Sequence, residues 1–356
     1  MPATPRPSTS RAKPESKSPC ANGSALRFQM YPNQGAGRLP SRTIAEVKKT
    51  NYGGHMYVIT GATGNTGSVI AETLLAQGEK VRIISRSPER LGRFVEKGAE
   101  PFVADVTDTA ALSRAFQGAL AVYTMVPPVY NAADPLGEIL RVGSALAAAV
   151  EKARVSYVVN LSSVGAHLAE KAGPVSGLHA VEQMLNRIAG ANVLHLRAAF
   201  FMENLFFSID LIKSMGIMGG SLRGDLPLPF IATRDIGAVA AEALRKRNFS
   251  GKQTRELLGQ RDVTMSEAAA VIGKAIGKPT LRYVQFSYAQ AGQAMQQMGM
   301  SASVAKALNE MYAAINDGLM APLEKRSAQN TTPTSIETFV SEVFLPRFKA
   351  KAAAGA

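Results

Sequence analysis

The sequence contains one cysteine, Cys20, and no tryptophan among its 356 residues. A single cysteine excludes an intrachain disulfide framework and a zinc site built from several thiolates, and we expect no resident metal. It also suits a reducing compartment, so we expect a cytoplasmic protein. No uninterrupted apolar run approaches the roughly 18 residues that a membrane-spanning helix requires, which predicts a protein without a membrane partner.

Acidic residues are scarce at the start of the chain, and this scarcity accounts for over half of the net charge of +13. Residues 1–55 hold nine Lys or Arg and two Glu, a net charge of +7, which leaves +6 for the rest of the chain. The body is therefore only mildly basic, as a protein that binds a polyanionic cofactor would be. No helix-turn-helix, zinc finger or other reading motif appears, so we expect no nucleic-acid partner.

Residues 1–55 also lack periodic apolar residues and are rich in Pro, Ser, Gly, Lys and Arg. We expect a disordered basic leader, because such a segment buries too little surface to offset chain entropy. It lacks the apolar core of a secretory signal, and its prolines disfavour the amphipathic helix of a mitochondrial transit peptide. An alternative is that Met56 is the native start, since codons for Gly53 and Gly54 can form a ribosome-binding site. The leader would then be translated upstream sequence.

The rest of the chain alternates short β-branched runs with helical segments as far as residue 200. Strands are predicted at 56–60, 80–85, 100–105, 120–126, 155–162 and 192–197. Helices are predicted between them at 67–78, 87–98, 107–118 and 134–153. Strands spaced by helices of this length predict an α/β fold, a doubly wound parallel (Rossmann) sheet over residues 56–200. Continuously apolar strands such as "YVVNL" fit a sheet that is covered on both faces.

The periodicity weakens after residue 200. Helices are predicted at 200–216, 233–247 and 265–275, and residues 285–356 are largely helical in pattern. We expect a small, mainly helical substrate-binding region over residues 201–350. It would interleave with the Rossmann domain and cap the carboxyl edge of its sheet. Residues 221–230 would form a lid or only a connection.

A glycine-rich loop, "TGATGNTG", joins the first predicted strand to the first predicted helix. In this context Gly61 would permit a tight turn, Gly64 a close approach to a pyrophosphate, and Gly67 close packing of helix on sheet. The helix start supplies unpaired N–H groups and a positive dipole, both of which stabilise an anion. The strand before and the helix after therefore predict a dinucleotide site.

The end of the second predicted strand indicates which dinucleotide binds. An acidic residue there would accept hydrogen bonds from an adenosine 2′-hydroxyl, but the sequence reads "IISRSPER" and has Arg86 instead. A guanidinium suits a 2′-phosphate in charge and geometry, which favours NADP, with NADPH preferred over NADH. Asp105, at the end of the third strand, would hydrogen-bond the adenine amino group or cap the next helix.

Several motifs together resemble the NmrA-like family of atypical short-chain dehydrogenases/reductases. They include "VITGATGNTG", "ADVTD", "VVNLSSVGAH", "LRAAFFMENL" and "TRDIGAVAAEAL", in unbroken order over about residues 56–345. The resemblance implies an NAD(P)-binding Rossmann domain; members include quinone, azo-dye and triphenylmethane reductases, non-catalytic redox sensors and a nitrogen-metabolite repressor. The cofactor contacts carried over by position would be Gly61, Thr63, Gly64, Asn65, Thr66, Gly67, Arg86 and Asp105. The nicotinamide side would be lined by Thr124, Val126 and Ser162.

The wider superfamily carries a Tyr-x-x-x-Lys pair on the helix after the fifth strand, and this sequence lacks it. The segment reads "GPVSGLHAVEQML", where His179 is the only titratable base near the expected place. The alternative for His179 is packing beside Glu182. Tyr130, in the loop after the fourth strand, is a weaker proton-donor candidate, and His167 and His195 are weaker still.

The missing pair narrows the chemistry. Hydride addition to a simple ketone creates an alkoxide that needs a positioned acid, whereas a hydroquinone anion is stabilised by its ring and water can protonate it. We therefore predict an NADPH-dependent reductase of a small conjugated acceptor, such as a quinone or azo compound. The alternative is a non-catalytic NADP(H) redox sensor that acts through a protein partner, which requires different affinities for NADP⁺ and NADPH.

Overall fold

Seven strands between residues 56 and 257 build one parallel sheet. The computed structural model describes residues 56–353, with side chains as far as residue 350, so the predictions for residues 1–55 lie outside the described residues. The strand order is β10-β6-β5-β4-β1-β2-β3, and every neighbouring pair is parallel. The strands are β1 (Met56–Ile59), β2 (Val81–Ser85), β3 (Glu100–Val103), β4 (Ala119–Thr124), β5 (Tyr157–Ser163), β6 (Asn192–Ala198) and β10 (Lys252–Leu257).

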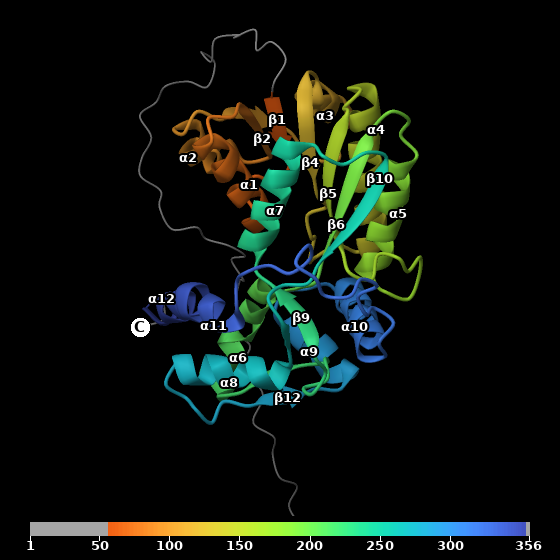
Figure 1. The fold of residues 1–356 in the computed structure, drawn as a ribbon. Helices are drawn as coiled ribbons and strands as arrows, with labels where there is room; N and C mark the ends of the chain where they lie inside the picture. Colours follow the sequence, from red (N-terminus) through yellow and green to blue (C-terminus); the bar gives the residue numbers. More distant parts are fainter. Residues whose placement is uncertain (1–55, 354–356) are drawn as a thin grey trace, which may run out of the picture. The chain divides into compact units, whose positions relative to one another are not determined.

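Helices cover both faces of this sheet (Figure 1). They are α1 (Asn65–Ala76), α2 (Gly92–Val95), α3 (Thr109–Phe116), α4 (Pro135–Lys152), α5 (Pro174–Asn186) and α7 (Thr233–Lys246). Alternate strand residues enter opposite cores: Ile59 packs with the α1 and α7 side, and Val58 packs with the α3, α4 and α5 side. The predicted doubly wound parallel sheet is confirmed.

Two predictions within the sheet half are wrong in detail. The predicted helix at 87–98 is two short pieces, η2 (Pro88–Arg90) and α2. Sequence patterning also missed β10, which adds a seventh strand beside β6. Its sequence is "KQTREL" and its first three residues are exposed, so this edge strand lacks the apolar signature of its neighbours.

The region after residue 200 has its own core beneath the carboxyl edge of the sheet. Its elements are β7 (Phe200–Phe201), η3 (Met202–Ser208), α6 (Ile209–Met215), β8 (Met218–Gly220), β9 (Leu228–Ile231), β11 (Asp262–Val263), α8 (Met265–Ala275), β12 (Tyr283–Gln285), α9 (Tyr288–Gln297), α10 (Ala302–Asn316), α11 (Ile336–Phe339), η4 (Val340–Phe344) and α12 (Leu345–Ala353). The segment predicted as one helix at 200–216 is a two-residue strand, a 3-10 turn and a short helix. The strand forms because Phe200 and Phe201 pair with β9.

The helices of the described chain are too short or too polar to serve as bilayer spans.

Candidate functional site

The glycine loop folds closely against its own backbone. Gly61 has a φ of +63°, which favours glycine, and a β-carbon on it would lie 2.8 Å from Sδ of Met125. The Gly64 N–H donates to the Gly61 carbonyl at 2.9 Å. A β-carbon on Gly67 would lie only 2.3 Å from that same carbonyl oxygen. The turn therefore requires glycine at both ends of the loop.

The loop delivers the chain to an uncapped helix start. Gly64 occupies the position before α1, no side chain caps the helix, and its first turn contains no acidic residue. Gly64 and Asn65 are exposed, while Thr63 is half-buried. The free N–H groups and the helix dipole suit an anion such as a pyrophosphate.

Thr66 turns its hydroxyl away from this helix start. Its Oγ1 lies 3.0 Å from the hydroxyl of Tyr123, and both residues are buried. Burial raises the pKa of the Tyr123 phenol, so the pair stays neutral. Only the backbone N–H of Thr66 is left to face a phosphate.

Arg86 and Asp105 lie together beyond the ends of β2 and β3. Arg86 is 3.7 Å from Asp105, and its side chain is 75% exposed. Hydrogen bonds from the hydroxyl and N–H of Thr107 hold the pKa of Asp105 below its usual value, and Arg86 adds to this. The cap of α3 is Asp108, so the capping alternative for Asp105 is wrong. An exposed pair this long stabilises little, which leaves Arg86 available to another anion.

Sequence reasoning missed a second arginine beside the loop. The guanidinium of Arg90 donates to the carbonyl of Thr63 at 3.3 Å, linking η2 to the glycine loop. Arg86 and Arg90 thus place two guanidinium groups on the segment after β2. The signal was present in "SRSPER", where the arginines stand four residues apart.

Thr124, at the end of β4, points into the protein interior. It is fully buried, and its hydroxyl donates to Oδ1 of Asn160 at 2.9 Å. Asn160 in turn contacts Nδ1 of His195 at 3.1 Å, and Nε2 of His195 contacts Oδ1 of Asn186 at 2.9 Å. Burial lowers the pKa of His195 to about 4, which keeps its ring neutral. His195 is therefore a structural group at neutral pH.

Ser162, at the end of β5, belongs to a second buried network. Its hydroxyl donates to Oε1 of Glu182 at 2.5 Å, and Arg197 binds both oxygens of Glu182, at 3.0 and 2.7 Å. Successive strand residues face opposite ways, so Ser163 faces away from Glu182. Ser163 is half-buried and donates to the Val164 carbonyl. Sequence reasoning passed over it, although the doubled serine at a strand end was the signal.

The two candidate proton donors lie on different elements. His179, on α5, is half-buried, and its Nδ1 donates to the carbonyl of Ala166 at 2.9 Å. That bond leaves Nε2 as the acceptor of the neutral ring. Glu182, the partner considered for His179, binds Arg197 instead. Tyr130 packs edge-on against Phe207 of η3, with ring centroids 5.9 Å apart. Val126, half-buried, packs on the core beneath α4.

The predicted cofactor positions lie at or just beyond the carboxyl ends of neighbouring strands. The glycine loop follows β1, Arg86 follows β2, Asp105 follows β3, and Thr124 and Ser162 end β4 and β5. Because these strands are adjacent and parallel, the positions share one edge of the sheet. Ligands of open α/β sheets bind at this edge, where the strand order reverses at β1 and β4. The described residues contain no group of three His, Cys, Asp or Glu that could hold a metal ion.

Comparison with known proteins identifies the family and supports the fold. The chain is 28% identical to an NAD(P)H azoreductase of Xenophilus azovorans over 258 residues, which is 72% of this chain and 86% of that protein. The structure of the Escherichia coli NADPH-dependent quinone oxidoreductase with NADPH has a TM-score of 0.69 at 24% identity, covering 81% of this chain and all of that one. The structure of NmrA, a negative transcriptional regulator, with NADP has a TM-score of 0.65 at 15% identity, covering 84% and 98%. The model of the NmrA-like family matches residues 55–340, and the chain belongs to that family.

Proposed function

We propose that this protein is an NADPH-dependent reductase that transfers hydride to a small conjugated acceptor, such as a quinone or an azo compound. One observation carries the choice of acceptor: two ionisable groups beside β5 and β6, Glu182 and His195, are held in buried hydrogen-bond networks. Glu182 is bound by Arg197, and His195 is held neutral between two asparagines. The helix α5 carries neither Tyr nor Lys. An acceptor whose reduced anion is stabilised by conjugation suits such a site, because water can protonate it.

The residues of the glycine loop fit a dinucleotide. Gly64, Asn65 and the N–H groups of the first turn of α1 would hold the pyrophosphate, and Gly61 and Gly67 keep the turn tight enough for its approach. Asp105 would accept from the adenine amino group, and the end of β4 would lie beside the nicotinamide. Bound NADPH supplies the hydride, and the chain's task is to hold the acceptor within transfer distance.

Arg86 is the proposed determinant of NADPH preference, with Arg90 as a second cation for the 2′-phosphate. We expect Arg86→Asp to weaken NADPH binding about tenfold or more and to leave NADH binding nearly unchanged, because only NADPH carries the 2′-phosphate. Titration of both cofactors by fluorescence measures this. Arg93→Asp, with the same charge change on α2, should leave both affinities within about twofold. Unchanged NADPH affinity in Arg86→Asp would rule out the assignment.

The reaction is tested by following NADPH oxidation against quinones, azo dyes and aliphatic ketones. We expect saturable turnover of conjugated acceptors and none of the ketones. If ketones were reduced as well as quinones, a positioned acid would have to exist, and His179→Gln and Tyr130→Phe would identify it.

A second candidate function is that of an NADP(H) sensor that acts through a protein partner. His179 is held by a hydrogen bond to the carbonyl of Ala166 and has no acidic partner on α5. Such a histidine is also compatible with a site that catalyses no reaction. This function requires NADP⁺ and NADPH to bind with different affinities, because a ligand shifts only the equilibrium that it binds differentially. Folded, cofactor-loaded protein with no turnover and unequal affinities would favour the sensor.

A further inference from the structure

Two motifs that the cofactor site does not explain meet in the structure. "FFMEN" covers residues 200–204 and "TRDIG" covers residues 233–237. The parallel pairing of β7 with β9 brings the residues that follow each strand side by side. Glu203 then accepts the N–H of Thr233 at 3.1 and 3.2 Å and its hydroxyl at 2.5 Å. Both the backbone N–H and the hydroxyl of Thr233 thus donate to the carboxylate of Glu203.

Glu203 acts as a cap for α7 supplied by a distant segment. The residue before α7 is Ala232, which has no side chain that can cap the helix. The Glu203 carboxylate satisfies a first-turn N–H of this helix and places negative charge at its positive end. Burial raises the pKa of Glu203, while the bonds from Thr233 oppose that rise. Burying a carboxylate costs free energy unless the group is hydrogen-bonded, and here Thr233 supplies the hydrogen bonds.

The same helix packs on α1, the helix that begins at the glycine loop. A β-carbon on Gly237 would lie 2.6 Å from Cβ of Val69 and 3.1 Å from the carbonyl of Thr66. Thr66 and Val69 belong to the first turns of α1, beside which α7 runs (Figure 1). The first two turns of α7 therefore touch the helix that begins at the glycine loop and, through Glu203, the η3 segment.

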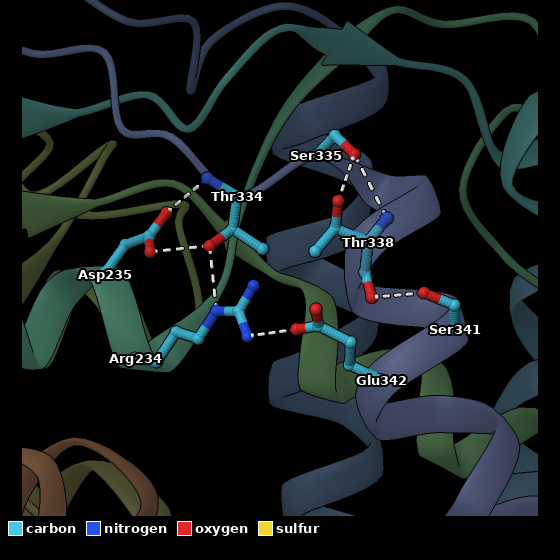
Figure 2. A network of polar contacts seen from close by, with 7 residues as sticks. All are labelled: Arg234, Asp235, Thr334, Ser335, Thr338, Ser341 and Glu342. Carbon is cyan, nitrogen blue, oxygen red and sulfur yellow. Dashed lines mark hydrogen bonds and ion pairs between the residues drawn. The ribbon is translucent and has the colours of Figure 1, made fainter.

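The first turn of α7 also binds a segment near the C-terminus, residues 334–342. Figure 2 shows Asp235 accepting the N–H of Thr334 at 3.0 Å and its hydroxyl at 2.6 Å. Arg234 reaches Oγ1 of Thr334 at 2.9 Å and Glu342 of η4 at 2.6 Å. Three consecutive residues of α7 thus bind three other segments, and α7 cannot shift against one without disturbing the rest.

The segment that Glu203 anchors carries an exposed aromatic ring toward the loop after β4. Phe207 is 39% exposed although it is apolar, and its ring packs edge-on against Tyr130. Tyr130 belongs to the loop that leaves the carboxyl end of β4, next to β1 and its glycine loop. The exposed face of such a pair suits a flat conjugated molecule.

We propose that Glu203 is a positioning residue for the acceptor: by capping α7 it fixes the spacing between the cofactor loop and the Phe207–Tyr130 pair, on which a planar acceptor stacks. This proposal rests on the proposed reductase function for its substrate. Glu203 does not touch the reacting atoms, and its effect passes through η3 and Phe207.

Steady-state kinetics on the full chain with a quinone that supports turnover test it. We expect Glu203→Ala to raise the quinone KM about tenfold or more while the Kd for NADPH stays within about twofold. Glu203→Gln keeps an oxygen that accepts both hydrogen bonds from Thr233, so its quinone KM should stay near the wild-type value. Phe207→Ala should reproduce the KM change. Glu337→Ala, which removes an exposed carboxylate bound to Arg261, should leave KM unchanged.

A second readout does not depend on turnover. Binding of NADP⁺ to the full chain should slow amide hydrogen exchange in residues 202–209 of the wild type and of Glu203→Gln, but not of Glu203→Ala. If no acceptor is reduced and this protection still depends on Glu203, the reductase function fails, but the coupling that Glu203 provides between the cofactor site and η3 stands. An unchanged quinone KM in Glu203→Ala, or equal protection in wild type and Glu203→Ala, would overturn the positioning role.

Discussion

The sheet half and the region after residue 200 are held together by different means. In the sheet half, parallel backbone ladders and two apolar cores position the strands, and two buried polar networks join β5, β6 and α5. The later region is fastened to the sheet half by side-chain bonds, such as Glu203 to Thr233 and Asp235 to Thr334. We therefore expect the geometry of the sheet that would bind the cofactor to change little with most single side-chain substitutions. The position of the region after residue 200, which would hold the acceptor, depends on a few side-chain hydrogen bonds.

The largest effect on stability should come from removing one partner of the buried ion pair between Glu182 and Arg197 in the sheet half. Glu182→Ala leaves the guanidinium buried without its partner, and we expect a loss of about 3–5 kcal/mol in the free energy of unfolding. Urea denaturation measures it. The matched control is Glu138→Ala, which removes an exposed pair with Arg141 and should cost less than about 1 kcal/mol. Equal losses in both variants would show that burial does not set the cost.

His195 makes the sheet half sensitive to acid. Its pKa is about 4 in the folded protein against 6.5 ordinarily, so between these values the unfolded chain binds a proton that the folded chain does not. Stability from this group is complete above pH 6.5 and falls by about 3 kcal/mol as the pH drops to about 4. We expect His195→Gln to be less stable at pH 7 but to lose less stability on acidification. Parallel pH profiles for wild type and variant would contradict this.

The same contrast explains what could be predicted from sequence. Strands such as "YVVNL" and the glycine loop were predicted because their signals are local: an apolar run, or glycines at fixed spacing. The fold class and the cofactor edge follow from these signals. The contacts of Glu203 and Asp235 could not be predicted, since each joins segments 30 or 99 residues apart. The inward turn of Thr124 was missed because its partner, Asn160, lies on another strand.

A substitution at Gly67 tests whether the glycine loop is as rigid as the sheet that it follows. In Gly67→Ala the new β-carbon meets the carbonyl of Gly61, a backbone atom that cannot move without opening the turn. We expect a loss of about 1–3 kcal/mol in stability and NADPH binding weakened more than tenfold. Calorimetry with and without NADPH measures both. Gly292→Ala, in the interior of α9, meets a side-chain atom, Nδ2 of Asn309 at 3.2 Å, and should leave NADPH affinity nearly unchanged. A normal cofactor affinity in Gly67→Ala would mean that the loop adapts.

The smallest effect on stability should come from removing one of the side-chain hydrogen bonds that join the region after residue 200 to α7. Thr334→Val removes the hydroxyl that donates to Asp235 and accepts from Arg234, while the backbone N–H of residue 334 still binds Asp235. We expect a loss of about 1 kcal/mol in stability. Ser341→Ala, an exposed hydroxyl of η4, is the control and should change little. Hydrogen exchange distinguishes a local from a global effect: exchange of residues 334–344 should quicken in Thr334→Val while the amides of β1, β4 and β5 keep their protection. A uniform increase across the sheet would instead mean that the two regions unfold as one unit, and that side-chain tethers do not set the stability of the later region separately.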